Sequence, residues 1–122
     1  MHTLAVVLIL LVAALHLYFL ALEMFLWQQP LGLKTFRNTP EKAATTAVLA
    51  ANQGLYNGFL AAGLFWGLLL GGNQSPMGRP VALFFLGCVI VAGVYGSATA
   101  SRKIIFVQAV PGAITMAAVL LS

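Results

Sequence analysis

The sequence predicts an all-α fold: a polytopic membrane bundle of four helices with both termini on the extracytoplasmic side. Of the 122 residues, 61% are hydrophobic and 7% are charged, a composition too apolar for an ordinary soluble domain. The charged side chains leave four long stretches free of charge, at residues 1–22, 43–78, 80–101 and 104–122. Each stretch reaches or approaches the roughly 20 residues that a helix needs to cross the hydrocarbon core of a bilayer. These stretches are continuously apolar rather than alternating, which favours helices over a membrane barrel.

The helices are expected within one transmembrane domain that covers residues 1–122, at about 4–27, 40–70, 81–100 and 104–121. The first ends before Pro30, and Trp27 suits the headgroup interface. Thr39 followed by Pro40 is typical of an N-cap and a first helical position. The Gly-Gly-Asn-Gln-Ser-Pro run at 71–76 is a strong turn signal that ends the second helix.

The distribution of Lys and Arg predicts the orientation of these helices. The loop between the first two helices holds three such residues, the loop between the last two holds Arg102 and Lys103, and the middle loop holds Arg79. Because basic residues accumulate in cytoplasmic loops, this bias places both termini outside, in a multi-pass protein of the bacterial inner membrane. The basic residues are scattered without interleaved aromatics, so we expect the lipid bilayer, and no nucleic acid, as a partner.

Polar side chains inside the predicted spans are the candidate site residues, because each costs free energy in hydrocarbon unless it is paired. On the first helix, His16 and Glu23 are seven residues apart and therefore share a face. The candidate ligand-binding residues are Glu23, Asn52, Gln53, Tyr56, Asn57, Tyr95 and Gln108. In the predicted orientation most of them lie in the cytoplasmic half of the membrane, which favours either a polar pocket open to the cytoplasm or a buried hydrogen-bonded network.

Each of these residues also has a purely structural interpretation. The amides can hold helices together, the ring of His16 can be satisfied by a neighbour, and Glu23 can anchor a loop by pairing with Lys34 or Arg37. In a catalytic interpretation, Glu23 or His16 accepts a proton and Tyr95 donates one. Since no nucleophile, phosphate loop or haem motif accompanies them, enzymatic activity stays an open question. We expect no metal site and assign no cofactor, because His16 is a lone histidine within its span.

Small residues at a spacing of four predict tight helix packing and a homo-oligomer. Three such ridges occur: Gly54, Gly58 and Ala62; Ala92, Gly96 and Ala100; and Ala109, Ala113 and Ala117.

The chain resembles a family of small bacterial and fungal integral membrane proteins that is known only as a domain of unknown function. The residues that carry the resemblance are Leu49 to Gly63 (LAANQGLYNGFLAAG), His16-Leu17-Tyr18-Phe19, Glu23-Met24 and Gly87 to Gly96 (GCVIVAGVYG). The resemblance implies four helices, and it implies that these polar residues are the family's signature positions.

A weaker similarity is to the membrane-associated proteins in eicosanoid and glutathione metabolism, which are four-helix chains with outside termini that form trimers. Asn52 and Asn57 lie where that family has its second-helix motif, but the arginines of the motif are missing here. The similarity therefore implies the architecture and not glutathione conjugation.

The sequence favours a membrane protein whose polar pocket binds, or also acts on, a small amphipathic or lipid-like molecule. Two alternatives stay open. One is a proton-coupled small transporter, suggested by four helices with one carboxylate in the membrane. The other is an accessory subunit of a larger membrane complex, suggested by the small size and the packing ridges.

Overall fold

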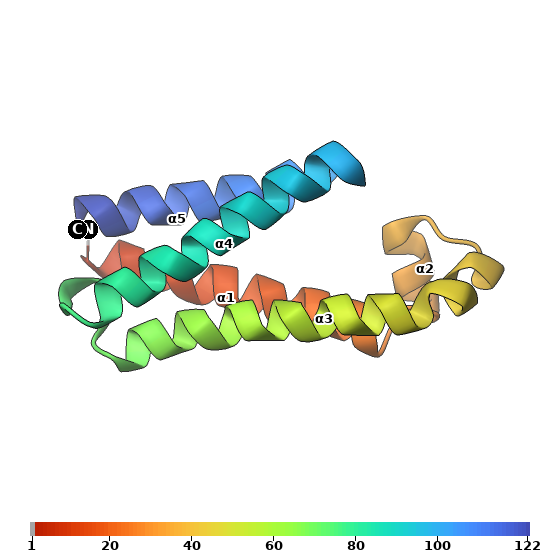
Figure 1. The fold of residues 1–122 in the computed structure, drawn as a ribbon, viewed down its shortest axis with the longest axis horizontal. Helices are drawn as coiled ribbons and strands as arrows, with labels where there is room; N and C mark the ends of the chain where they lie inside the picture. The colour runs from red at the N-terminus through yellow and green to blue at the C-terminus, as the bar shows by residue number, and fades with distance from the viewer. Residues whose placement is uncertain (1) are drawn as a thin grey trace. The chain divides into compact units, whose positions relative to one another are not determined.

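The computed structural model describes residues 2–122, which form α-helices, a short 3-10 helix and a π-helix, with no strand in that range (Figure 1). The elements are α1 (His2–Met24), α2 (Pro30–Phe36), α3 (Pro40–Leu69), η1 (Gly72–Gln74), α4 (Gly78–Thr99), η2 (Ile105–Ala109) and α5 (Val110–Leu121). The predicted all-α class is confirmed. Among the described residues, α1 and α4 are long and apolar enough to cross a membrane.

The chain forms two compact units. Residues 14–61, called the central unit here, hold the second half of α1, α2 and most of α3. The terminal unit holds the start of α1 up to Ala13 together with residues 62–122.

In the central unit, glycines bring α3 close to α1. A Cβ atom at Gly54 would lie 2.6 Å from the Cγ atom of Met24 and 3.2 Å from the backbone oxygen of Leu20, and one at Gly58 would lie 2.8 Å from a methyl group of Leu20. A side chain at Gly54 would press on the backbone of α1, whereas one at Gly58 would displace the end of the Leu20 side chain. Gly54 and Gly58 of the first predicted ridge therefore pack on α1 within the chain, whereas its third member, Ala62, is exposed.

The segment after α1 is more structured than the polar loop that the sequence predicts. α1 ends at Met24 rather than near Trp27, and the Trp27 indole Nε1 donates to the backbone oxygen of Ala43 and to Thr46 Oγ1, both at 3.1 Å. Its ring also packs on Phe36 of α2, with the ring centroids 4.7 Å apart. These contacts fix the segment onto the first turns of α3.

Local sequence explains where α2 and α3 begin and end. Pro30 is the first residue of α2, and Arg37 ends that helix with a left-handed φ of 54°. The N-cap predicted at Thr39 is confirmed, because the Lys42 backbone N–H donates to Thr39 Oγ1 at 3.2 Å. After α3, Gly71 adopts a φ of 111° and Gly72 a φ of 72°, values that only glycine adopts without strain.

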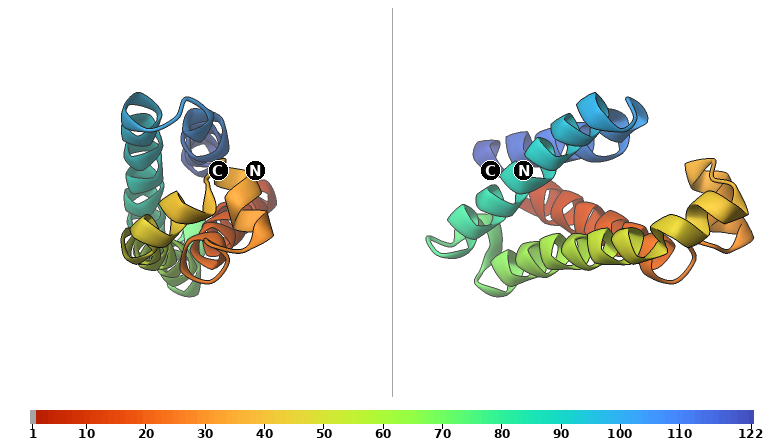
Figure 2. Two further views of the ribbon diagram at one scale, coloured as in Figure 1. Left: turned by 90° about the vertical axis from the view of Figure 1, so that its right-hand side faces the viewer. Right: turned by 45° about the vertical axis from the view of Figure 1, so that its right-hand side comes forward.

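In the terminal unit, α4 packs against η2 and α5, as the two helices drawn in cyan and blue show (Figure 2). A Cβ at Gly93 of α4 would lie 2.5 Å from the Ala109 nitrogen, and one at Gly112 of α5 would lie 2.9 Å from a methyl group of Val89. The closest approach on α4 thus uses Gly93, which belongs to neither of the predicted ridges.

The two remaining ridges stay largely uncovered in this unit. Ala92 and Ala100 on α4 are exposed, as are Ala113 and Ala117 on α5, whereas Ala109 is 5% exposed. The spacing of four thus locates small residues on α4 and α5, but it does not indicate which of them lie in the contact between these helices.

The helix expected at 104–121 begins as a π-helix, η2, before it becomes α5. Pro111 explains this change, because a proline has no N–H for the carbonyl of residue 107 and its ring crowds that carbonyl. A wider turn relieves this clash. Gln108 lies inside the wide turn and is 9% exposed.

Candidate functional site

The central unit contains two buried polar residues on one face of α1. The side chain of His16 is fully buried, and that of Glu23 is 8% exposed. The His16 ring meets the Phe19 ring edge-on at a centroid distance of 5.4 Å and makes further contacts within the protein. The seven-residue spacing that predicted a shared face thus corresponds to two side chains that are both removed from solvent.

Glu23 is held by Asn57 of α3. The Asn57 side-chain Nδ2 donates to Glu23 Oε1 at 2.5 Å. The contact depends on Gly54, because a Cβ at that position would lie 3.2 Å from the Glu23 Cβ. The close approach of the two helices therefore brings the amide within reach of the carboxylate.

The alternative in which Glu23 anchors a loop through a basic side chain does not occur in the described residues 2–122. Lys34 and Arg37 are exposed, and the polar partner of the carboxylate is the amide of Asn57. A carboxylate removed from water without a cation needs water, a proton or a bound group to complete its environment.

The other polar residues of α3 lie away from this pair. Asn52 and Gln53 are exposed, and Tyr56 is 55% exposed, with its ring 5.9 Å from that of Phe59. Since α3 turns by 100° per residue, these side chains continue the polar arc from Asn57 round the helix. The arc therefore has one half-buried member, Asn57, which is bonded to Glu23, and an exposed part formed by the other three residues.

The two candidate residues outside α1 and α3 belong to the terminal unit. Tyr95 on α4 is 70% exposed, whereas Gln108 in η2 is buried and has its own contacts. Of the predicted site residues, the structure brings Glu23 and Asn57 into direct contact.

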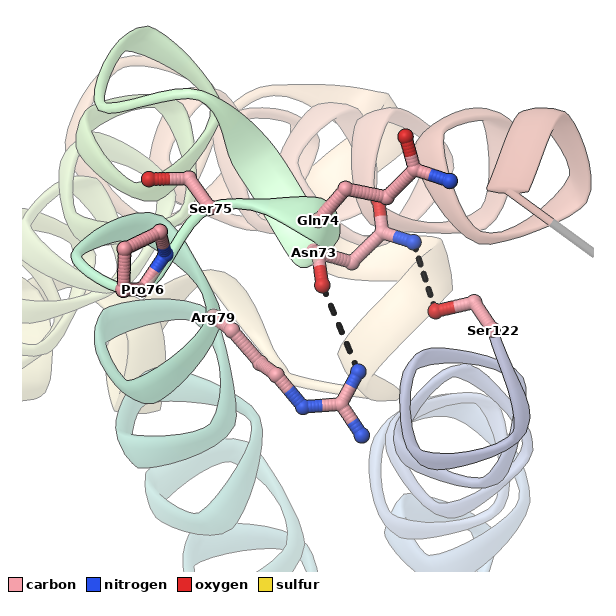
Figure 3. A pocket seen from close by; sticks show the side chains of 6 residues that line it. All are labelled: Asn73, Gln74, Ser75, Pro76, Arg79 and Ser122. Atoms are coloured by element: carbon pink, nitrogen blue, oxygen red, sulfur yellow. Dashed lines mark hydrogen bonds between the residues drawn. The ribbon is translucent and has the colours of Figure 1, made fainter.

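A second polar cluster, which the sequence did not single out as a site, lies in the terminal unit around Asn73 and Arg79 (Figure 3). The His2 Nδ1 donates to Asn73 Oδ1 at 3.1 Å, and Asn73 Nδ2 donates to Ser122 Oγ at 2.6 Å. Asn73 is 1% exposed. The start of α1 and the end of α5 therefore lie side by side, joined through one buried amide.

Arg79 completes this cluster by binding backbone oxygens. Its Nη1 donates to the oxygens of Asn73 at 3.3 Å and Val119 at 2.8 Å, and its Nη2 donates to that of Leu120 at 3.1 Å. The guanidinium thus caps the last turn of α5, whose free carbonyls carry partial negative charge. The available sequence signal was that Arg79 is the one charged residue between positions 43 and 101.

The cluster borders an open surface depression of about 590 Å³, called the cavity here, which is lined by Asn73, Gln74, Ser75, Pro76, Arg79 and Ser122 (Figure 3). Ser75 Oγ accepts from the backbone N–H groups of Met77 and Gly78, at 3.2 and 3.3 Å, and so holds the first turn of α4.

Within residues 2–122, no three His, Cys, Asp or Glu side chains gather in a way that could hold a metal ion.

These features define an all-helical protein with two helices that can cross a membrane by length and composition. The family model described as "Protein of unknown function (DUF1304)" matches residues 10–120, and the chain belongs to this family. The resemblance inferred from the sequence is thereby confirmed. The chain is also similar to a protein of Lactococcus lactis subsp. lactis described as "Uncharacterized protein YpaA", with 31% identity over 110 residues, which cover 88% of this chain and 89% of that protein. No solved structure matches the chain.

Proposed function

We propose that the chain is a multi-pass protein of the bacterial inner membrane, one domain with four spans and with both termini outside. Besides α1 and α4, two segments support this proposal. α3 has 30 residues and is about 45 Å long, more than the roughly 30 Å of hydrocarbon. The segment Ile105–Leu121 is apolar but shorter, at about 25 Å, a length that a locally thinned bilayer accommodates.

In this membrane protein, the function that the geometry supports best is the binding of a small amphipathic or lipid-like molecule next to Glu23 and Asn57. The observation that carries the proposal is the buried carboxylate held by an amide and not by a cation. A polar pair of this kind is costly within hydrocarbon and marks a functional position by default. Asn52, Gln53 and Tyr56 extend the polar surface along α3 from this pair.

The donors and acceptors of the pair indicate the chemistry of the ligand. Glu23 Oε2 is an acceptor, and Asn57 keeps a second N–H and its Oδ1 after donating to Glu23. A head group with an O–H or N–H donor satisfies Glu23, while an apolar tail lies along the hydrophobic helices. Long-chain amines and monoacylglycerols have this combination.

Ligand binding is tested with dodecylamine and monooleoylglycerol as probes on the purified protein in maltoside micelles. Saturation-transfer NMR is expected to detect binding of at least one probe to the wild type. Glu23→Gln is expected to weaken binding by about tenfold or more, since a hydrogen bond to a charged group is worth roughly 1.5–3 kcal/mol.

The matched control is Glu41→Gln, which removes the other carboxylate of the chain from an exposed position in the first turn of α3. It should bind the probes like the wild type. Equal weakening by both variants would indicate a general charge effect and would contradict a site at Glu23.

The same pair of variants separates binding from proton-coupled transport. In proteoliposomes with a pH gradient, a transporter would release a loaded amine only when Glu23 is intact. A protein that binds and does not transport would leave the gradient and the trapped amine unchanged, whichever residue is at position 23.

We also propose that the protein is a homo-oligomer. Since Gly54 and Gly58 already pack on α1, the ridge residues left for contact with a second copy are the exposed alanines: Ala62, Ala92, Ala100, Ala113 and Ala117. A partner helix can approach such positions closely.

A further inference from the structure

We propose that the cavity beside Arg79 is a binding site for a phosphate group, either of a phospholipid head group or of a soluble phosphate. This site lies in the terminal unit, is independent of Glu23, and is assigned from its charge, its donors and its cavity.

No Asp or Glu side chain is present in the unit that contains Arg79. The chain contains two acidic residues, Glu23 and Glu41, and both belong to the central unit. The terminal unit thus holds Arg79, Arg102 and Lys103 and no Asp or Glu. The carbonyls at the end of α5 offset only part of the charge of Arg79, since a helix end carries about half a unit charge.

The hydrogen-bond donors of Arg79 are also only partly used. A guanidinium has five N–H donors, and those of Nη1 bind Asn73 and Val119 while one of Nη2 binds Leu120. The Nε–H group and one N–H of Nη2 remain. Two neighbouring N–H groups of a guanidinium match two oxygens of a phosphate, which is the geometry of charge-assisted bidentate binding.

The surroundings of Arg79 suit such a ligand. Gln74 adds an exposed amide to the lining of the cavity. Because the cavity is open to solvent, a head group larger than a bare phosphate ion can also bind there. Asn73 is buried and its side chain is hydrogen-bonded to both His2 and Ser122. These bonds hold in place the Asn73 backbone oxygen that accepts from Arg79.

The direct test is solid-state NMR distance measurement between arginine ¹⁵N and phosphate ³¹P nuclei. Arg37→Gln and Arg102→Gln are combined so that Arg79 is the remaining arginine, and a neutral extension after Ser122 keeps a terminal carboxylate away from the cavity. In one arm the protein is in phosphatidylglycerol. In the other it is in a phosphate-free galactolipid with added inorganic phosphate.

The expected result is ¹⁵N–³¹P dephasing of the Arg79 guanidinium signal in at least one arm. Dephasing only with phosphatidylglycerol assigns a lipid head group, and dephasing only with inorganic phosphate assigns a soluble phosphate. No dephasing in either arm overturns the proposal, and because this protein retains Arg79, the result does not depend on the folding of an Arg79 variant.

A second measurement compares the retention of phosphatidylglycerol during purification by native mass spectrometry. Arg79→Gln is expected to reduce retention by about tenfold or more, the loss expected for one charge-assisted hydrogen bond. Arg79→Lys keeps the positive charge and loses the planar pair of N–H donors, so its retention of phosphatidylglycerol should lie between that of the wild type and that of Arg79→Gln. Arg102→Gln, at an exposed arginine of the same unit, is the control. Equal retention by a folded Arg79→Gln protein and the wild type contradicts the site.

Discussion

Gly93 of α4 lies against the backbone of Ala109 in η2, so that a Cβ at Gly93 would be 2.5 Å from the Ala109 nitrogen. Backbone atoms cannot move aside as the end of a flexible side chain can. Gly93→Ala should therefore lower the free energy of unfolding by about 1–3 kcal/mol, the usual cost of overpacking. Gly87→Ala on the same helix is the control, because its nearest neighbour is the Met116 methyl group at 3.9 Å. Denaturant titration in micelles, followed by circular dichroism, compares the two variants, and equal stability would contradict the close contact.

The bond between Glu23 and Asn57 should appear as a coupling in a double-mutant cycle. Asn57→Leu leaves a buried carboxylate without the amide that binds it, and we expect a loss of about 1–3 kcal/mol in the free energy of unfolding. Glu23→Leu combined with Asn57→Leu should be less destabilised than the sum of the single changes, because no polar group is then left unpaired. Strict additivity in the same titration would show that the bond contributes nothing to stability.

Trp27 is expected to hold α2 and the preceding turn onto α3. Trp27→Phe removes the N–H that donates to Ala43 and Thr46 and should cost about 1 kcal/mol. Amide hydrogen exchange should accelerate in residues 30–36 and stay unchanged in α4. Thr46→Val removes one acceptor and leaves the Ala43 bond, so it should have the smaller effect. Unchanged exchange in α2 would contradict the anchoring role.

Changes at two kinds of small residue should separate folding from assembly. Gly58→Leu is expected to destabilise the single chain, since a Cβ there would already meet Leu20. Ala113→Leu, at an exposed position of α5, should leave the fold intact and reduce self-association. Analytical ultracentrifugation in detergent measures the assembly of both. A wild type that sediments as a monomer would refute the proposed homo-oligomer.

The orientation of the protein can be tested with reporters fused after Ser122. Because Lys and Arg favour the two loops on the opposite side from the termini, a reporter that works only in the cytoplasm should be inactive there, and one that works only outside should be active. The reverse pattern would place the Glu23 side of the helices outside. A fusion in the loop at Arg102 serves as the internal control.

Apolar composition and helix signals let the sequence by itself determine the all-α class. The sequence also predicts that Thr39 caps α3 and that glycines end it. Capping and turn preferences can be predicted in this way because they depend only on the backbone of a few neighbouring residues. The shared face of His16 and Glu23 also follows from helical geometry alone. The family resemblance rests on the same local runs of residues.

Contacts between distant parts of the chain could not be determined in this way. The bond from Asn57 to Glu23 and the exposure of Asn52, Gln53 and Tyr56 depend on how α3 is rotated against α1. Spacing alone defines an arc of polar residues and does not say which part of the arc meets another helix. That rotation is set by where glycine lets two backbones approach, at Gly54 in one unit and at Gly93 in the other.

The cluster at Arg79 shows the same division most clearly. From the sequence, Arg79 was a single positive charge in a short loop, and its natural interpretation was a topology signal. Only the tertiary structure brings the end of α5 to it, where its Nη atoms bind the carbonyls of Val119 and Leu120, some 40 residues later in the chain. An arginine has five N–H donors, and which acceptors they bind depends on the groups around them. Here those groups are brought together by long-range packing that no local pattern specifies.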